Sequence, residues 1–525
     1  EVDDVPGEAA ILVRYLGQVT VARIRLPQLQ PTTRPAVNNA IDELAWNRLQ
    51  TLGLQASATT GDAQFLRRVS LDTIGTLPTP AEARAFLADT SPAKRTALIT
   101  RLLERKEYSQ YWAMKWADIL RVDKEIIQPV GTIAMTRWLT DQFSKNVPYD
   151  HFVRDIVTAQ GNTLSESPAA FYLVHNNPEK LVRSVSQVFL GVRIECAQCH
   201  HHPFEKWSQS DYAAFGGFFT GISQKGSTGG GKKIFDKAGE DQKHPRTGQT
   251  VPTAGLGAPP LEGEALGHRR HALADWMTAA ENPFLARMLA NRLWAHYLGR
   301  GLVEPIDDMR ATNPATNEPL LELLAQRLVS NGYDIKDLTQ FILSSRTYQL
   351  SAEANDSNNR DNQNFSHASW KAVPAEVLLD AISQVTGVTE QFNGWPDGYR
   401  AIEIWDNRMP SYFFRIFGKP QRVSVCECER GNEPSIVQAL YLMNSTETMA
   451  KISHRHGRAI ELAQSTLSDD KIIEELYLAA LSRFPSDEEL ALMRTAFDAK
   501  GIARRTAVED IMWALLNTRE FVLNH

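Results

Sequence analysis

Amphipathic helical periodicity recurs along most of this chain from about residue 37 onward, and no other feature limits its possible folds as strongly. In the first helical run, Ile41, Leu44, Ala45, Leu49 and Leu52 share one face. Helical patterns continue in "AKRTALITRLLERKEYSQYWAMKWADILRV" and in "PLLELLAQRLVSNGYDIKDLTQFILSSRTYQLSA". These patterns predict a mainly α fold.

Helix-start signals support the same interpretation. In "TPAE" (79–82), Thr79 occupies the N-cap, Pro80 follows at the first helical position, and Glu82 stands three residues after the cap. The stretch "SDEE" (486–489) has the same capping-box pattern. We therefore expect helices to begin directly after Thr79 and after Ser486.

Two parts of the chain depart from the helical pattern. In "GEAAILVRYLGQVTVARIRLP" (7–27), apolar and polar residues alternate roughly every second position, which predicts two short strands around "LGQ". Residues 223–262 are rich in Gly, Pro and Lys without periodicity, which predicts a long loop. The chain then divides into a β segment with its linker (1–35), a helical domain (36–222), the loop, and a second, mainly helical domain (263–525).

The predicted loop contains "GSTGGGKK" (226–233), which fits the G-x-x-x-x-G-K pattern of a phosphate-binding loop. Lys233 stands where such a loop needs a Ser or Thr for magnesium, and no buried strand precedes the segment. We therefore expect a flexible basic loop and no nucleotide site.

Composition limits the function classes. A chain of 525 residues is too long for one ordinary core, and 43% hydrophobic with 22% charged residues is typical of a soluble globular protein. A net charge of −6 disfavours nucleic acid as a general partner. No run approaches the ~20 apolar residues of a membrane span, and the first residues lack the pattern of a secretory signal.

The stretch "IECAQCHHHPFEKW" (194–207) holds two of the four cysteines and three consecutive histidines. Cys196, Cys199 and His200 form C-x-x-C-H, the attachment sequence of c-type haem. Two thiols one helical turn apart can bond to the two vinyl groups of haem, and the adjacent imidazole can bind its iron. The motif predicts covalent haem c with His200 as the proximal iron ligand; the spacing identifies no sixth ligand.

Other chemistry fits the same residues. A disulfide or a redox thiol pair would explain Cys196 and Cys199, although it would leave His200 without a role. A zinc or iron site without haem is a further alternative, because thiolates and imidazoles are typical ligands of both metals. Its ligands would come from His200, His201 and His202, and Cys426 and Cys428 could complete a set of four thiolates with Cys196 and Cys199. In an oxidising compartment, Cys426 and Cys428 would instead be candidates for a disulfide.

Weaker candidates for chemistry lie close by in the sequence. His202 is two residues beyond the predicted iron ligand, so it is a candidate for outer-sphere support or proton transfer. His296 lies on a predicted helix, and Asp307, Asp308 and Arg310 lie in the turn that follows. Paired carboxylates can do acid–base work, but a solvated turn with an ion pair is the commoner reason for such a pattern.

Long stretches of the chain resemble planctomycete protein families. "DAQFLRRVSLDTIGTLPTPAEARAFLAD", "WAMKWADILRV", "NVPYDHFVRDIVTAQGN" and "FLGVRIECAQCHHHPFEKWSQSDYAAFGGFF" look like the planctomycete cytochrome-type domain. "NPFLARMLANRLWAHYLGRGLVEPIDDMRATNP", "SSRTYQLSA", "PAEVLLDAI" and "VCECERGNEPSIVQALYLMN" look like the planctomycete-specific domain of unknown function that usually follows it. The N-terminal strands are similar to the end of a bacterial Ig-like module.

The resemblance implies an exported protein, periplasmic or extracellular, with a link to polysaccharide catabolism. It adds no independent support for haem, because the cytochrome label rests on the same C-x-x-C-H motif. Three hypotheses follow. The first is an exported monohaem c-type redox protein, an oxidoreductase with a redox partner or a carbohydrate substrate. The second is a metal-dependent hydrolase or lyase without haem that acts on polysaccharide, and the third is a disulfide-stabilised surface protein for binding or structure.

Overall fold

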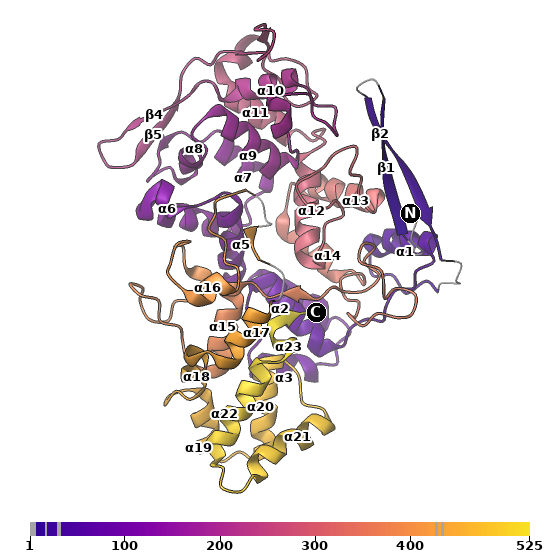
Figure 1. Ribbon diagram of the computed structural model, residues 1–525, viewed down its shortest axis with the longest axis vertical. Helices are drawn as coiled ribbons and strands as arrows, with labels where there is room; N and C mark the ends of the chain where they lie inside the picture. The colour runs from indigo at the N-terminus through magenta and orange to yellow at the C-terminus, as the bar shows by residue number, and fades with distance from the viewer. Residues whose placement is uncertain (1–6, 16–17, 29–32, 426–428, 432–434) are drawn as a thin grey trace. The chain divides into compact units, whose positions relative to one another are not determined.

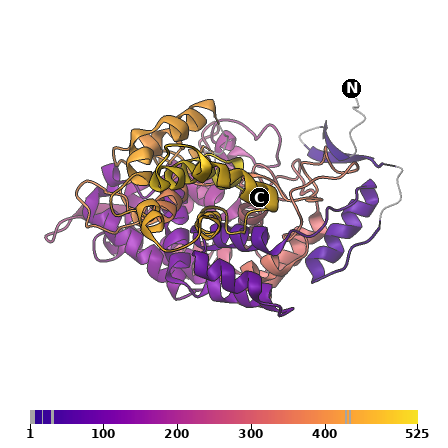
Figure 2. The same ribbon diagram turned by 90° about the horizontal axis from the view of Figure 1, so that it is seen from below.

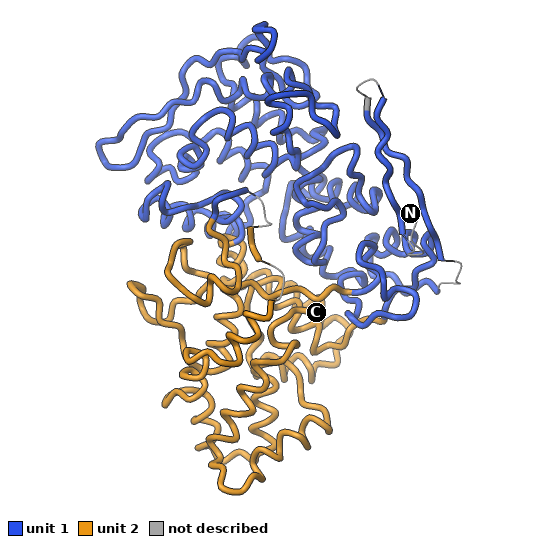
Figure 3. The backbone as a smooth tube through the Cα atoms, viewed as in Figure 1, with its two compact units in different colours: residues 1–57, 115–367, 422–427 blue, residues 58–114, 368–421, 428–525 orange. Residues whose placement is uncertain are grey.

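The computed structural model describes residues 7–15, 18–28, 33–425, 429–431 and 435–525. The chain forms two compact units, which are coloured separately in Figure 3. Unit 1 contains residues 1–57, 115–367 and 422–427, and unit 2 contains residues 58–114, 368–421 and 428–525. Each unit therefore draws on segments that are far apart in the sequence, and one boundary falls inside helix α5 (Lys106–Ile119). The linear division at residues 36, 223 and 263 stays a prediction.

Unit 1 is mainly helical (Figure 1). Helix α12 (Leu285–Leu298) is buried along nearly its whole length and packs against three other helices, α9, α13 and α14. The helices and turns of this unit besides α12 are α1 (Ala40–Leu52), α6 (Lys124–Ser144), α7 (Tyr149–Val157), η1 (Ser167–Ala170), α8 (Phe171–Val174), α9 (Pro178–Leu190), η2 (Glu195–Gln198), α10 (Gln209–Gly216), η3 (Gly217–Phe219), η4 (Gly263–His268), α11 (Arg269–Thr278), α13 (Glu318–Ser330) and α14 (Ile335–Ser344).

Unit 2 is also mainly helical, so the fold class predicted from periodicity is confirmed. Helix α20 (Asp469–Leu481) is largely buried and packs against α3, α15, α21 and α22. The remaining elements are α2 (Asp62–Ile74), α3 (Pro80–Ala88), α4 (Lys94–Leu103), β8 (Lys371–Ala372), α15 (Ala375–Thr386), η5 (Ala401–Glu403), α16 (Tyr412–Ile416), α17 (Ile436–Asn444), α18 (Thr446–Ile452), α19 (Arg458–Gln464), α21 (Asp487–Asp498), α22 (Arg504–Leu516), α23 (Arg519–Val522) and β9 (Leu523–Asn524). Among the described residues, no helix is both long and apolar enough to cross a bilayer.

Both predicted capping boxes are confirmed. The Thr79 hydroxyl accepts a hydrogen bond from the Glu82 N–H at the start of α3, and the Glu82 carboxylate accepts one from the Thr79 N–H at 2.8 Å. Ser486 and Glu489 make the same reciprocal pair at the start of α21. Each box satisfies N–H groups that have no partner within the helix, so these two helices begin where the sequence predicts.

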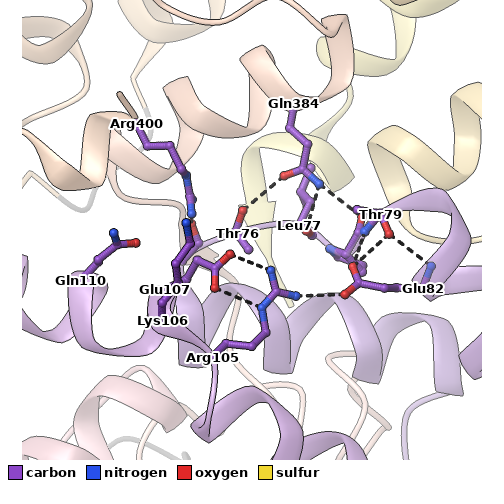
Figure 4. Close-up of polar contacts among 12 residues, drawn as sticks. Thr76, Leu77, Thr79, Glu82, Arg105, Lys106, Glu107, Gln110, Gln384 and Arg400 are labelled. Carbon is purple, nitrogen blue, oxygen red and sulfur yellow. Dashed lines mark hydrogen bonds and ion pairs between the residues drawn. The ribbon is translucent and has the colours of Figure 1, made fainter. Parts of the chain in front are cut away.

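The capping box of α3 belongs to a larger polar network in unit 2, shown in Figure 4. Arg105 donates to Glu82 at 3.0 Å and also pairs with Glu107. The amide of Gln384, on α15, donates to the Leu77 carbonyl at 2.9 Å. The Gln384 contact attaches the loop between α2 and α3 to α15, a helix about 300 residues later in the sequence.

The two predicted N-terminal strands form an antiparallel hairpin, β1 (Gly7–Tyr15) with β2 (Gln18–Leu26), which lies beside α1 in Figures 1 and 2. Within the described part of the chain, the two strands pair only with each other. Glu8 of β1 forms an ion pair with Arg48 of α1 at 2.8 Å, which ties the hairpin to this helix. The similarity to an Ig-like module stays a prediction.

The segment predicted to be a long loop carries short strands. β4 (Ile222–Gly226) and β5 (Lys232–Asp236) form a hairpin, and β3 (Gly161–Asn162) pairs with the other side of β5. β6 (Gln242–Lys243) pairs with β7 (Thr250–Val251). "GSTGGGKK" therefore leads from one strand into another, whereas a phosphate-binding loop leads from a strand into a helix.

A buried carboxylate joins α1 to the segment that follows α14. Asp42 is fully buried, and its Oδ1 accepts hydrogen bonds from the backbone N–H and the hydroxyl of Thr347, both at 2.8 Å. Its Oδ2 accepts hydrogen bonds from the N–H groups of Arg346 at 2.9 Å and Asn38 at 2.8 Å. Burial of a charge is costly unless such donors surround it, so one side chain holds "SSRTYQLSA" against α1.

We expect Asp42→Asn to lower the free energy of unfolding by about 2–3 kcal/mol, because the amide nitrogen cannot accept the hydrogen bonds that one carboxylate oxygen accepts. Glu43→Gln on the same helix is the control, since the Glu43 side chain is 53% exposed; we expect a change below about 0.5 kcal/mol. Urea unfolding curves measure both values. Equal effects of the two substitutions would show that Asp42 is not an anchor.

The buried imidazole of His175 makes unit 1 sensitive to acid. Its Nδ1 lies 2.8 Å from the Ser184 hydroxyl, and burial, followed by the charges of Arg121 and Lys180, lowers its pKa to about 3. Below pH 6.5 the unfolded chain binds a proton here that the folded chain does not, so stability falls as the pH falls from 6.5 toward 3.

His175→Gln should therefore flatten the dependence of stability on pH between 6.5 and 4, where the wild-type histidine contributes at most about 1.4 kcal/mol per pH unit. Urea midpoints at several pH values measure this slope. His151→Gln is the matched control, because the His151 side chain is 68% exposed. An unchanged slope in His175→Gln would contradict the assignment.

Candidate functional site

The C-x-x-C-H stretch follows helix α9 in unit 1. This helix ends at Gly191, whose φ of 67° lies in the left-handed region. A Cβ at this position would come within 2.8 Å of the Met288 sulfur. Glycine is thus required both for the turn and for the close packing. Four residues later, at Glu195, the 3₁₀ turn η2 begins.

Turn η2 presents the two cysteines of the motif on one side. The Cys199 N–H donates to the Cys196 carbonyl at 3.4 Å, which closes a turn of three residues. Side chains one 3₁₀ turn apart project from the same side, with Cα atoms about 6 Å apart. Ala197, between the cysteines, is fully buried and anchors the turn. Cys196 and Cys199 are exposed and unpaired, so both thiols are accessible.

His200 and His201 follow at the surface. The His200 Nδ1 lies 2.8 Å from the His201 carbonyl oxygen. A carbonyl only accepts hydrogen bonds, so the neutral imidazole carries its proton on Nδ1 and has a lone pair on Nε2. Imidazoles that bind metals commonly have one nitrogen held in this way. His200 therefore fits the role of an iron or zinc ligand through Nε2.

The residues around the thiols are polar. Glu195 forms an ion pair with Arg183, and the Gln209 amide donates to the Cys199 carbonyl at 2.8 Å. These groups interact well with water, whereas the edge of a haem is apolar. The thiols and the imidazole therefore fit haem attachment, whereas these polar neighbours do not supply apolar contacts for a haem edge.

His202 differs from its two neighbours because its side chain is buried. Its backbone N–H donates to the Trp207 carbonyl at 2.9 Å, and its Nδ1 accepts a hydrogen bond from the Phe204 N–H at 3.2 Å. Burial and the charge of Arg310 lower the pKa of His202, although Glu205 and Asp308 oppose this effect. The imidazole is therefore neutral near pH 7, and its Nδ1 is already occupied within the loop.

A second loop of unit 1, residues 307–312, makes three hydrogen bonds to the segment 191–205 that contains the C-x-x-C-H motif. The Met309 N–H donates to the Gly191 carbonyl at 2.8 Å, just before the cysteines. The Ala311 N–H donates to the Glu205 carboxylate at 2.8 Å, and the Thr312 hydroxyl donates to the Phe204 carbonyl at 2.6 Å. The C-x-x-C-H stretch and the turn with Asp307, Asp308 and Arg310 are about 110 residues apart in the sequence. These contacts bring them together in one site.

The paired carboxylates of the second loop are buried, whereas such a pattern more often lies in a solvated turn. Asp307 forms an ion pair with Arg193 and accepts a hydrogen bond from the Gln187 amide at 2.6 Å. Asp308 forms an ion pair with Arg310 at 2.7 Å. Both carboxylates are therefore held by cations or amides, and their use in acid–base chemistry stays a prediction.

Asn291, on the buried helix α12, holds in place the segment that leads into the loop 307–312. Its side-chain oxygen accepts a hydrogen bond from the Val303 N–H at 2.9 Å. Its amide nitrogen donates to the carbonyls of Val303 at 2.9 Å and Ile306 at 3.1 Å. Because Ile306 directly precedes Asp307, one buried amide sets the position of the carboxylate pair.

The remaining predicted residues lie elsewhere or are not described. His296 is half-buried on α12, and its ring lies edge-on to that of Tyr297, at 4.7 Å between centroids. Cys426 and Cys428 lie outside the described residues, so their predicted roles as ligands or as a disulfide stay predictions. Across the described parts of the chain, no three His, Cys, Asp or Glu side chains are arranged as a metal site.

Sequence reasoning did not identify Glu205, Arg193, Gln187 or Asn291. Glu205 lies inside the quoted histidine-rich stretch, and a carboxylate beside Phe204 and Trp207 is the only local signal that it is buried. The other three residues act through partners more than ten residues away, so their local sequence gives no sign of their roles.

Glu205→Ala should weaken the attachment of loop 307–312 to the C-x-x-C-H segment without unfolding unit 1. Loss of the Ala311 hydrogen bond should speed amide exchange of residues 309–312 about tenfold, corresponding to about 1.4 kcal/mol of local opening free energy. Hydrogen–deuterium exchange with peptide mapping measures this. Lys206→Ala is the control, because it leaves the Glu205 carboxylate in place; similar exchange in both variants would contradict the role of Glu205.

Comparison with known proteins supports the order of the two predicted domains. Residues 40–224 match the family model PSCyt2, described as a protein of unknown function (DUF1549). Residues 269–497 match the family model PSD1, described as a protein of unknown function (DUF1553). No curated protein and no solved structure matches the chain. A region similar to PSCyt2 is thus followed by a region similar to PSD1, and both regions contribute residues to the site in unit 1.

Proposed function

We propose that the protein is an exported c-type redox protein with one haem held covalently by Cys196 and Cys199 and with His200 as the proximal iron ligand. The observation that carries this proposal is the accessibility and arrangement of the thiols and the imidazole in the C-x-x-C-H motif. Two accessible, unpaired thiols lie on one side of a single turn, and the imidazole that follows them has its Nε2 available. The two thiols would form the covalent bonds to the porphyrin, and the free Nε2 would bind the iron.

Bound haem would supply one-electron transfer at its iron. The chain itself would hold the porphyrin through the two thiols and would fix the His200 ring through the hydrogen bond to the His201 carbonyl. His202 would remain neutral and bound within its loop, beside the Asp308–Arg310 ion pair. The polar surroundings would leave the haem edge open to solvent, which suits transfer to a docking redox partner.

The oxidoreductase activity, the link to polysaccharide and the periplasmic or extracellular location rest on the family resemblance and form part of this proposal. A zinc or iron site without haem is the second candidate, in a hydrolase or lyase that acts on polysaccharide. The polar residues beside the thiols favour this alternative, because a hydrated metal ion needs no apolar surface. These residues are Arg183, Glu195 and Gln209. Cys196, Cys199 and His200 would supply its first ligands.

Expression of the full chain in a host with cytochrome c maturation tests the proposal. We expect a Soret band, a pyridine haemochrome spectrum and an intact mass increased by one haem. The double variant Cys196→Ser/Cys199→Ser should lose the mass increment, and His200→Ala should keep the increment but change the spectrum. His201→Ala is the control, because in this proposal His201 contributes only its backbone carbonyl.

Wild-type protein with neither Soret band nor mass increment would overturn the haem proposal. Elemental analysis then separates the alternatives. Zinc or iron that is lost in the double cysteine variant supports the metal site. Metal-free protein in which Cys196 and Cys199 resist alkylation until they are reduced supports the disulfide-stabilised surface protein.

A further inference from the structure

Three lysines share one face of the β4–β5 hairpin in unit 1. Lys225 of β4 lies directly opposite Lys233 of β5 in the antiparallel register. Lys237 follows β5, four residues after Lys233, and therefore projects to the same side as Lys233. All three side chains are exposed. We call Lys225, Lys233 and Lys237 the lysine face.

The lysine face surrounds an aromatic ring. Phe235 lies between Lys233 and Lys237 on the same side of β5. The Lys225 ammonium is 5.5 Å from the centre of the Phe235 ring, and the Lys237 ammonium is 5.8 Å from it. At these distances the ring attracts the two ammonium groups weakly, so it helps to keep them close together.

No carboxylate of the described residues forms an ion pair with this face. Among the described residues, none of the three lysines forms an ion pair. The carboxylate of the hairpin, Asp236, projects to the opposite side, where it pairs with Arg270 at 2.8 Å and accepts a hydrogen bond from Gln160 at 3.1 Å. The charge of the face is therefore available to an external anion, although the whole chain has a net charge of −6.

Structural needs explain only part of this arrangement. Like charges directly opposite each other in a sheet are destabilising. Lysine on an edge strand discourages unwanted strand pairing, and this accounts for Lys225, because β4 is an edge of the sheet β3-β5-β4. Lys233 lies on the central strand β5, where no edge needs protection. A role in binding an anion accounts for both Lys225 and Lys233, which repel each other across the two strands.

We propose that the lysine face binds the sulfate esters of a sulfated polysaccharide. Ammonium groups act as point charges and suit compact oxyanions, whereas carboxylate recognition favours the two-pronged contact of arginine. The Phe235 ring is half-buried and flanked by ammonium groups, so it offers little surface for stacking of a nucleic-acid base or for insertion into a lipid bilayer. This inference is independent of haem and goes beyond the proposed redox role.

Titration of the full chain with dextran sulfate tests the proposal, with neutral dextran as the uncharged polymer. We expect binding to dextran sulfate alone, with an affinity that falls as sodium chloride is added. The triple variant Lys225→Gln/Lys233→Gln/Lys237→Gln should bind at least tenfold more weakly. Lys145→Gln is the matched control, because the Lys145 side chain is 67% exposed in the same unit, and its affinity should stay within twofold of wild type.

A stability measurement separates a binding role from a structural one. Lys233→Gln removes the repulsion across the strands, so we expect its thermal midpoint to be equal to or above that of wild type at low salt; a lower midpoint would overturn the proposal. Failure of wild-type protein to bind dextran sulfate, or equal binding by the triple variant, would also overturn it. Tighter binding to oligodeoxythymidine or to phosphatidylserine vesicles would overturn the choice of ligand.

Discussion

Buried carboxylates connect segments of unit 1 that are far apart in the sequence, and the candidate site depends on them. A carboxylate inside a protein is costly unless hydrogen-bond donors or cations surround it. Asp42 accepts hydrogen bonds from the segment after α14, Glu205 accepts one from Ala311, and Asp307 interacts with Arg193 and Gln187. Each of these partners lies about a hundred or more residues away. The need to satisfy these charges therefore selects one arrangement of the helices and loops.

The two family regions are not independent in this arrangement. Gly191 and Glu205 lie within the PSCyt2 match, whereas Met309 and Ala311 lie within the PSD1 match, and hydrogen bonds join the two pairs. The beginning of the PSD1 region thus completes the surroundings of the C-x-x-C-H stretch. The rest of that region, from residue 368 onward, contributes mainly to unit 2. A function assigned to either region alone would therefore omit part of the site.

Within the site, the three consecutive histidines differ in burial and therefore in which ring nitrogen is available. Of three consecutive histidines, His200 and His201 are at the surface, and His202 is enclosed with its Nδ1 occupied. His200 is the one whose tautomer leaves Nε2 available beside two accessible thiols. The polar surroundings favour a solvent-accessible centre over a deeply enclosed one. The lysine face, on a hairpin of the same unit, adds a surface with the opposite sign to the net charge of the chain.

The sequence by itself determined the elements whose causes are local. Helical periodicity, the capping boxes at Thr79 and Ser486, the N-terminal hairpin and the C-x-x-C-H spacing all depend on residues within about one turn or one strand pair. Only the tertiary structure decided which histidine is buried, which partners hold Asp307 and Asp308, and how segments interleave in the two units. Burial and ion pairing arise from contacts across hundreds of residues, and the local pattern around a side chain does not encode them.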